Sequence, residues 1–155
     1  MSIHITARLE NDDPVRRRLA DMAARVADMQ PAMREIGETL KANIQMGFRD
    51  GADPWGRSWD PLRHRQGQPL RDTGQLMNSI SWRLIGRQGV QIGPSDNAGK
   101  SRMHQFGGIS RGAFYGARIP ARPYLPIRDG HVDLPQAWAD DVLEIVDEHI
   151  GGGHA

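Results

Sequence analysis

Histidines, carboxylates and hydroxyls are the residues of this chain that could carry chemistry, and their spacing argues against catalysis. The 155 residues contain no cysteine, which excludes thiolate nucleophiles and cysteine-based zinc sites. The histidines share no i, i+4 pairing and no carboxylate at metal-ligand spacing; they are His4, His64, His104, His131, His149 and His154. The sequence therefore predicts a protein that is not an enzyme and holds no metal or cofactor. The enzymatic alternative, a small hydrolase of unrecognised type, would need convergent acids and a pocket.

Basic residues are distributed unevenly along the chain, although the formal net charge is only +1. Residues 57–128 contain twelve Lys or Arg and three acids, whereas residues 129–155 contain seven acids and no Lys or Arg. Eighteen of the twenty basic residues are arginine, which binds carboxylates and phosphates through a planar, bidentate fork. The basic stretch predicts either a solvated face or a surface that docks on something acidic: nucleic acid, a neighbour's C-terminal tail or another protein.

The N-terminal part of the chain predicts a strand followed by a long helix or a helix pair. Residues 3–9 alternate apolar and polar side chains, as in a half-buried strand. The Asn-Asp-Asp-Pro stretch at 11–14 favours a helix start. An apolar stripe then recurs at steps of three and four residues; its members are Val15, Leu19, Met22, Val26, Met29, Met33, Ile36 and Leu40. Pro31 predicts a kink or two helices that meet near Gln30, with the stripe facing the core or, alternatively, a partner helix.

The middle of the chain predicts a packed loop followed by a β-hairpin. Residues 50–75 are punctuated by Gly and Pro, yet Trp55 and Trp59 favour burial over a flexible linker. Thr73 is a candidate cap for the short helical turn that follows. Residues 79–93 alternate apolar and polar side chains around a Gly-Arg-Gln-Gly turn, which predicts the hairpin.

The last third of the chain predicts a loop, an extended segment and a helix. Residues 94–118 are rich in Gly, Ser and Arg and predict a mobile loop. Residues 131–150 place apolar side chains on one helical face and acids on the other, before a flexible tail at 151–155. No run of about 18 apolar residues occurs, so we expect no membrane partner. Together these patterns predict one α+β domain over residues 1–155, with a long N-terminal helix or helix pair, a small antiparallel β-sheet with a hairpin, and a C-terminal helix.

The proline-rich segment IPARPYLPIR (residues 119–128) combines three prolines with basic and apolar side chains. Fixed proline dihedrals lower the ordering entropy that is lost on binding, and they block uncontrolled edge pairing. We expect its tyrosine and the following leucine to anchor the segment on a partner while its arginines supply charge. For Arg122 the alternative is an ion pair with a helix carboxylate of the same chain. For His104 and Gln105 a hydrogen bond that fixes the loop is favoured over an interface role.

Four motifs in order, DTGQLMNSI, GVQIG, HQFGG and IPARPYL, resemble the phage virion morphogenesis family, the tail-completion group that includes the Mu-like G proteins. The prelude of that pattern, W-x-x-L, matches WDPL at residues 59–62, and the resemblance spans about residues 55–128. The chain departs from the pattern at Arg102-Met103, where the family often has Tyr-Ala, and at Pro126. The matched positions are Trp59, Leu62, Thr73, Gly74, Leu76, Ser79, Ile80, Gly93, His104, Gln105, Gly107, Ala121, Arg122, Pro123 and Leu125.

This resemblance implies a structural protein of a tailed phage or prophage, located in the virion at the tail or the head–tail junction and assembled in the host cytoplasm. Such a protein would act stoichiometrically in tail completion or head–tail joining and would not catalyse a reaction. Its expected partners are neighbouring neck, connector, tail-tube or terminator proteins.

The charge layout adds a prediction about self-assembly. A basic middle and an acidic C-terminal helix are complementary between neighbours arranged head to tail, and such contacts close into rings when the rotation permits. An axial virion tail favours a hexamer, with a dodecamer next. DNA that passes through the ring lumen could contact the subunits without sequence specificity. The expected subunit or partner interface consists of Arg102, Arg111, Arg118, Arg122, Tyr124, Leu125, Arg128, Asp140, Asp141 and Glu144.

Two non-enzymatic alternatives remain open at this stage. The basic 57–128 region, with Arg-Gly-aromatic spacing in SRGAFYGAR, could track phosphates or stack bases as a nucleic-acid-binding module. A regulator that dimerises through the methionine-rich stripe would instead form a dimer and nothing larger.

Overall fold

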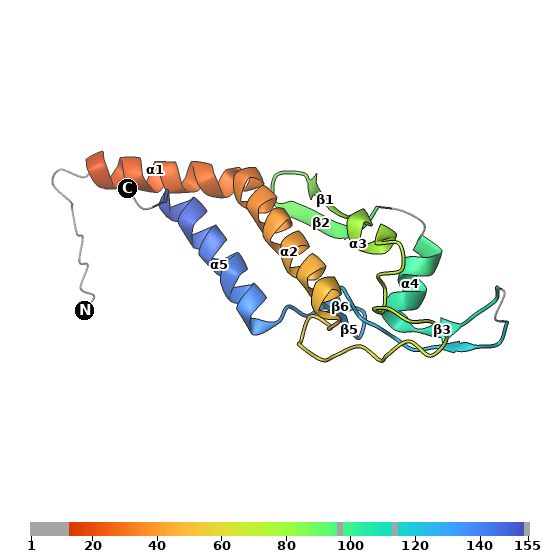
Figure 1. Ribbon diagram of the computed structural model, residues 1–155. Helices are drawn as coiled ribbons and strands as arrows, with labels where there is room; N and C mark the ends of the chain where they lie inside the picture. Colours follow the sequence, from red (N-terminus) through yellow and green to blue (C-terminus); the bar gives the residue numbers. More distant parts are fainter. Residues whose placement is uncertain (1–12, 96–97, 113–114, 154–155) are drawn as a thin grey trace, which may run out of the picture.

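Two helices form the N-terminal half of the structure, and the chain turns between them just before Pro31 (Figure 1). The computed structural model describes residues 13–95, 98–112 and 115–153. Helix α1 spans Asp13–Ala27 and helix α2 spans Gln30–Asp50. Pro31 lies in the first turn of α2, where a missing N–H costs no helical hydrogen bond. The predicted helix pair is therefore confirmed, whereas the predicted strand at residues 3–9 lies outside the described residues.

The predicted hairpin is present and packs against α2. Strands β1, Ile80–Ile85, and β2, Gly89–Pro94, pair in antiparallel register directly after the short helix α3, Gln75–Ser79. The indole of Trp82 lies so close to Gly37 of α2 that a Cβ built on this glycine would be 2.6 Å from a ring carbon. A larger residue at this helix position would therefore push the hairpin away from α2.

Residues 94–118 differ from the predicted loop. Helix α4 spans Ala98–Phe106, and β3, Gly108–Ile109, pairs in antiparallel register with β4, Arg118–Ile119. The loop prediction is wrong for α4, because the Gly-rich and Ser-rich composition concealed a helix that tertiary contacts stabilise. Gln105 of α4, whose side chain is 3% exposed, provides such contacts.

The C-terminal helix begins later than predicted. Strand β5, Ile127–Arg128, pairs with β6, His131–Val132, and only after Pro135 does helix α5 span Gln136–Gly151. Helix α5 lies alongside α2 (Figure 1) and buries Ile145 against it. No helix in the described ranges is both long and apolar enough to cross a membrane.

Two apolar clusters hold the elements together and share α2. The first joins the end of α2 to the packed loop, the hairpin and the proline-rich segment; its buried members are Ile44, Phe48, Trp59, Leu70, Ile80 and Tyr124. The second joins the start of α2 to α5; its buried members are Met29, Ala32, Ile36, Leu40 and Ile145. The predicted α+β class, with small antiparallel sheets and a C-terminal helix, is confirmed.

Candidate partner-binding surfaces

The side chain of Gln105 holds the proline-rich segment against the body of the subunit. Its Oε1 accepts hydrogen bonds from the backbone N–H groups of Tyr124 and Leu125 at 3.0 and 2.9 Å. Its Nε2 donates to the carbonyl oxygen of Leu125 at 3.0 Å. One buried amide thus satisfies three backbone groups of a segment whose prolines prevent regular strand pairing. The favoured loop-fixing role of Gln105 is confirmed.

Arg122 is 6% exposed, and its guanidinium serves the same subunit. Nε donates to the carbonyl oxygen of Asp60 at 2.9 Å, and Nη2 donates to that of Pro61 at 3.2 Å. Burial lowers the pKa of Arg122, and the nearby Asp60 carboxylate opposes this shift. The partners are two backbone carbonyls in the packed loop, and not the helix carboxylate considered from the sequence. The prediction that Arg122 belongs to an exposed interface surface is corrected accordingly.

Tyr124 is also buried within the subunit, with 3% of its surface exposed. Its hydroxyl donates to the carbonyl oxygen of Ser101 at 3.2 Å, and its ring lies 5.3 Å from that of Phe48. Leu125 is partly buried against the same cluster. Because an aromatic side chain gains more from a dry core than from a solvated surface, the proposed anchor on a partner is in fact an anchor in the core.

The remaining arginines of the predicted interface are exposed. Arg102 lies on α4, while Arg111 and Arg118 lie on or beside the β3–β4 pair, at the end of the molecule opposite α1 (Figure 1). Arg128 is half-exposed: its guanidinium lies 3.8 Å from the centre of the Trp55 ring and 3.3 Å from a carboxylate oxygen of Asp133. Arg102, Arg111 and Arg118 are therefore accessible to solvent, whereas Arg128 already has partners within the subunit.

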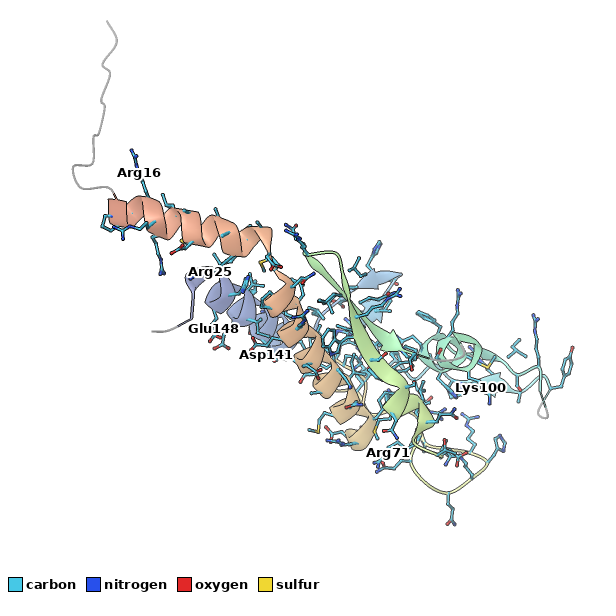
Figure 2. The ribbon with its side chains drawn as sticks, turned by 90° about the horizontal axis from the view of Figure 1, so that it is seen from above. Arg16, Arg25, Arg71, Lys100, Asp141 and Glu148 are labelled. Carbon is cyan, nitrogen blue, oxygen red and sulfur yellow. The ribbon has the colours of Figure 1, made fainter. Side chains whose placement is uncertain are left out.

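The acidic residues predicted for an interface are exposed on α5. Asp140, Asp141 and Glu144 lie on the face turned away from α2, and an oxygen of Asp140 accepts a hydrogen bond from Gln136 at 2.8 Å. Helix α5 carries five acids and no Lys or Arg. Figure 2 shows Glu148 beside Arg25 toward the α1 end of the subunit, Asp141 nearer the middle, and Arg71 and Lys100 toward the other end. The acids of α5 therefore lie beside the arginines of α1, and a second basic surface lies toward the other end of the subunit.

The outer face of α1 carries the first part of the predicted apolar stripe, for which a partner helix was the alternative to the core. Of the predicted apolar stripe, the α2 members are buried or partly buried, but Val15, Leu19 and Val26 are 47, 60 and 46% exposed. Helix α1 is held at the end of α5 by polar contacts, in which Arg18 donates to the carbonyl oxygen of Gly151 at 2.9 Å. The sequence signal for this surface was the stripe itself, because its period continues from α2 into α1. None of the described α1 side chains is buried, so the stripe residues of α1 remain accessible.

In the part of the chain that the structure describes, no group of three or more His, Cys, Asp or Glu side chains is arranged to hold a metal ion.

Comparison with known proteins agrees with the motifs. Residues 10–150 match the phage virion morphogenesis family. The chain is 32% identical over 143 residues to Mu-like prophage FluMu G protein 2 of Haemophilus influenzae, covering 92% of this chain and 94% of that protein. No solved structure matches. The family match and this identity cover nearly all of the chain, and it therefore belongs to the phage virion morphogenesis family.

Proposed function

We propose that this protein is a ring-forming subunit that acts in tail completion or head–tail joining of a phage or prophage. Membership of the virion morphogenesis family supports a structural role in phage particles, and the proposal builds on that role. In this proposal the subunit lies in the virion at the neck or tail end, after assembly in the host cytoplasm. Its neighbours would be neck, connector, tail-tube or terminator proteins.

The distance between the acids of α5 and the basic end of the subunit is the observation that carries the proposal. The exposed acids of α5 lie toward the α1 end, where arginines of α1 also lie, and the exposed arginines of α4 and the β3–β4 pair lie toward the other end (Figures 1 and 2). Different patches that complement each other on one chain favour head-to-tail contacts, which close into rings when the rotation permits. A hexamer is expected first and a dodecamer second.

Helix α1 supports the same proposal by supplying apolar area. Surface ion pairs contribute only about 0–1 kcal/mol each, so charge complementarity alone gives a weak contact. The exposed Val15, Leu19 and Val26 offer the kind of apolar surface that stable interfaces bury at their centre. Electrostatics would then select the orientation of the neighbour, and apolar burial would hold it.

Light scattering of the purified full chain at low and high salt, with negative-stain images of each peak, tests the proposal. We expect rings that dissociate at high salt, because exposed charges are screened within about 10 Å at 0.1 M salt. The triple variant Asp140→Asn, Asp141→Asn, Glu144→Gln should assemble less at low salt. A control triple removes exposed acids elsewhere: Glu35→Gln, Asp50→Asn and Asp129→Asn. Equal assembly of both triples at every salt concentration would refute the electrostatic contact.

A second candidate function is nucleic-acid binding through the 57–128 region. The exposure of Arg102, Arg111 and Arg118 favours it, because phosphate contacts need accessible cations. A gel shift with duplex DNA across salt concentrations tests this candidate. Binding that requires the assembled form would place the DNA in a ring lumen, whereas salt-sensitive binding by a monomer would favour an independent module.

A further inference from the structure

A cavity of about 440 Å³ lies between the packed loop, α4 and the proline-rich segment. The side chains of Leu62, Leu70 and Leu76 form apolar parts of its wall. Leu70 holds a left-handed backbone with φ 60°, a conformation that costs a non-glycine residue about 1–3 kcal/mol. Such strain persists where the surroundings hold the residue in place, and it is frequent around ligand sites.

Positive charge predominates around this cavity. Arg65, Lys100 and Arg122 line it from the loop, from α4 and from the proline-rich segment. Asp72 is the acidic residue in the lining, and its carboxylate lies 3.7 Å from the Arg65 guanidinium in an exposed pair. Asp60 acts on Arg122 from the same loop. Exposed pairs are weak, so this Asp72 contact leaves Arg65 available to another anion.

The side chain of His104 also lines this cavity. Its Nδ1 is buried, and it has no hydrogen-bond partner among the described residues. Burial lowers the pKa of His104, and Arg122 and Lys100 lower it further through repulsion of the imidazolium. The charge state of the His104 ring therefore responds to the charge of the groups around the cavity.

We propose that the cavity binds one oxyanion, a carboxylate or a phosphate group, between Lys100, Arg122 and His104. The Lys100 ammonium and the Nη1 of Arg122, which is not used in the bonds to Asp60 and Pro61, supply charge-assisted hydrogen bonds, and the His104 ring lies beside the anion. The leucines of the wall suit the methylene groups of an acidic side chain presented by a partner protein. Free phosphate has the same chemistry and is the second source. The site does not depend on ring formation, because one subunit contains all of these residues.

The test is an NMR titration of the ¹⁵N-labelled full chain, in which the ring of His104 is followed. The His104→Gln spectrum assigns its signal. Sodium phosphate and then a short polyglutamate peptide are added at constant ionic strength near neutral pH. We expect a saturable shift of His104 and a rise of its pKa, because an anion that favours the imidazolium is by linkage bound more tightly by it.

Two matched variants locate the site. Lys100→Gln should weaken anion binding by roughly tenfold, the usual size of one lost charge-assisted hydrogen bond. Lys100 is exposed, so the fold should survive, and equal thermal midpoints check this. Lys41→Gln removes the other lysine of the chain, which lies on α2, and should leave binding unchanged.

Each outcome decides the proposal. Saturation by both probes assigns the ligand to an acidic side chain of a partner, and saturation by phosphate alone assigns it to the free ion. Shifts that are similar at all histidines and do not saturate would overturn the site. Equal affinity of the Lys100→Gln and Lys41→Gln variants would overturn it as well, and so would a saturable response to duplex DNA alone.

Discussion

The proline-rich segment and helix α1 both carry arginines beside apolar side chains, yet they use them in opposite ways. In the segment, Arg122 and Tyr124 are 6 and 3% exposed and bond to backbone groups of their own subunit. In α1, Leu19 is 60% exposed, and the helix contacts α5 mainly at its end. The comparison teaches that residue type alone does not distinguish a structural contact from a partner surface, because burial decides between them.

The largest expected effect comes from the amide that holds the segment. Gln105→Ala should lower the free energy of unfolding by about 3 kcal/mol or more, because it leaves buried backbone groups of Tyr124 and Leu125 without partners. Urea unfolding of the monomer measures this loss. The control Gln45→Ala removes one hydrogen bond, to Met77, and should cost about 1 kcal/mol. Equal losses for the two variants would mean that the segment is not held by Gln105.

A smaller effect separates two arginines that the sequence analysis treated alike. Arg122→Lys should cost about 2 kcal/mol, because an ammonium cannot reproduce the fork that reaches the carbonyls of Asp60 and Pro61. The exposed Arg118→Lys should change the free energy of unfolding by less than about 0.5 kcal/mol. Denaturant unfolding compares the two. If Arg122→Lys impaired assembly and left stability intact, the assignment of Arg122 to the core would be wrong.

The pH dependence of the free energy of unfolding tests the environment of His104, which lines the cavity next to the proline-rich segment. The pKa of His104 is lowered in the folded state, so the unfolded chain binds the proton more readily. The contribution of His104 is therefore fully present above about pH 6.5, its unfolded pKa, and is lost as the pH falls toward the folded value. His104→Gln should flatten the stability profile in that window. A profile measured by denaturant unfolding that keeps the wild-type slope would contradict this origin.

The smallest effect on folding is expected on α1. Leu19→Ala should change the free energy of unfolding by less than about 0.5 kcal/mol, because the side chain is already largely in water. The same variant should reduce assembly, as measured by light scattering, if α1 contacts a neighbour. Ile85→Ala, which shortens an exposed apolar side chain on the hairpin, is the matched control. Similar assembly of both variants would remove α1 from the proposed interface.

The elements that the sequence predicted best are those in which apolar residues recur at a regular short spacing. The helix pair around Pro31 and the hairpin of β1 and β2 follow from spacing and turn residues alone, because their hydrogen bonds are local. Helix α4 was missed because its Gly, Ser and Lys residues carry little apolar period, and a long-range contact from Gln105 stabilises it. The predicted interface wrongly included the buried Arg122 and Tyr124 for the same reason, because the exposure of a side chain depends on residues far apart in the chain.

By itself, the sequence determined the family, the α+β class, the helix break and the separation of basic from acidic residues. These properties depend on residue identity and short spacing. The tertiary structure decided that the proline-rich segment packs into the core and that the apolar stripe divides into a buried α2 half and an exposed α1 half. It also decided that cations from three segments line one cavity. The physical reason is that burial and electrostatic fields are set by neighbours brought together in space, and no local pattern encodes which neighbours these are.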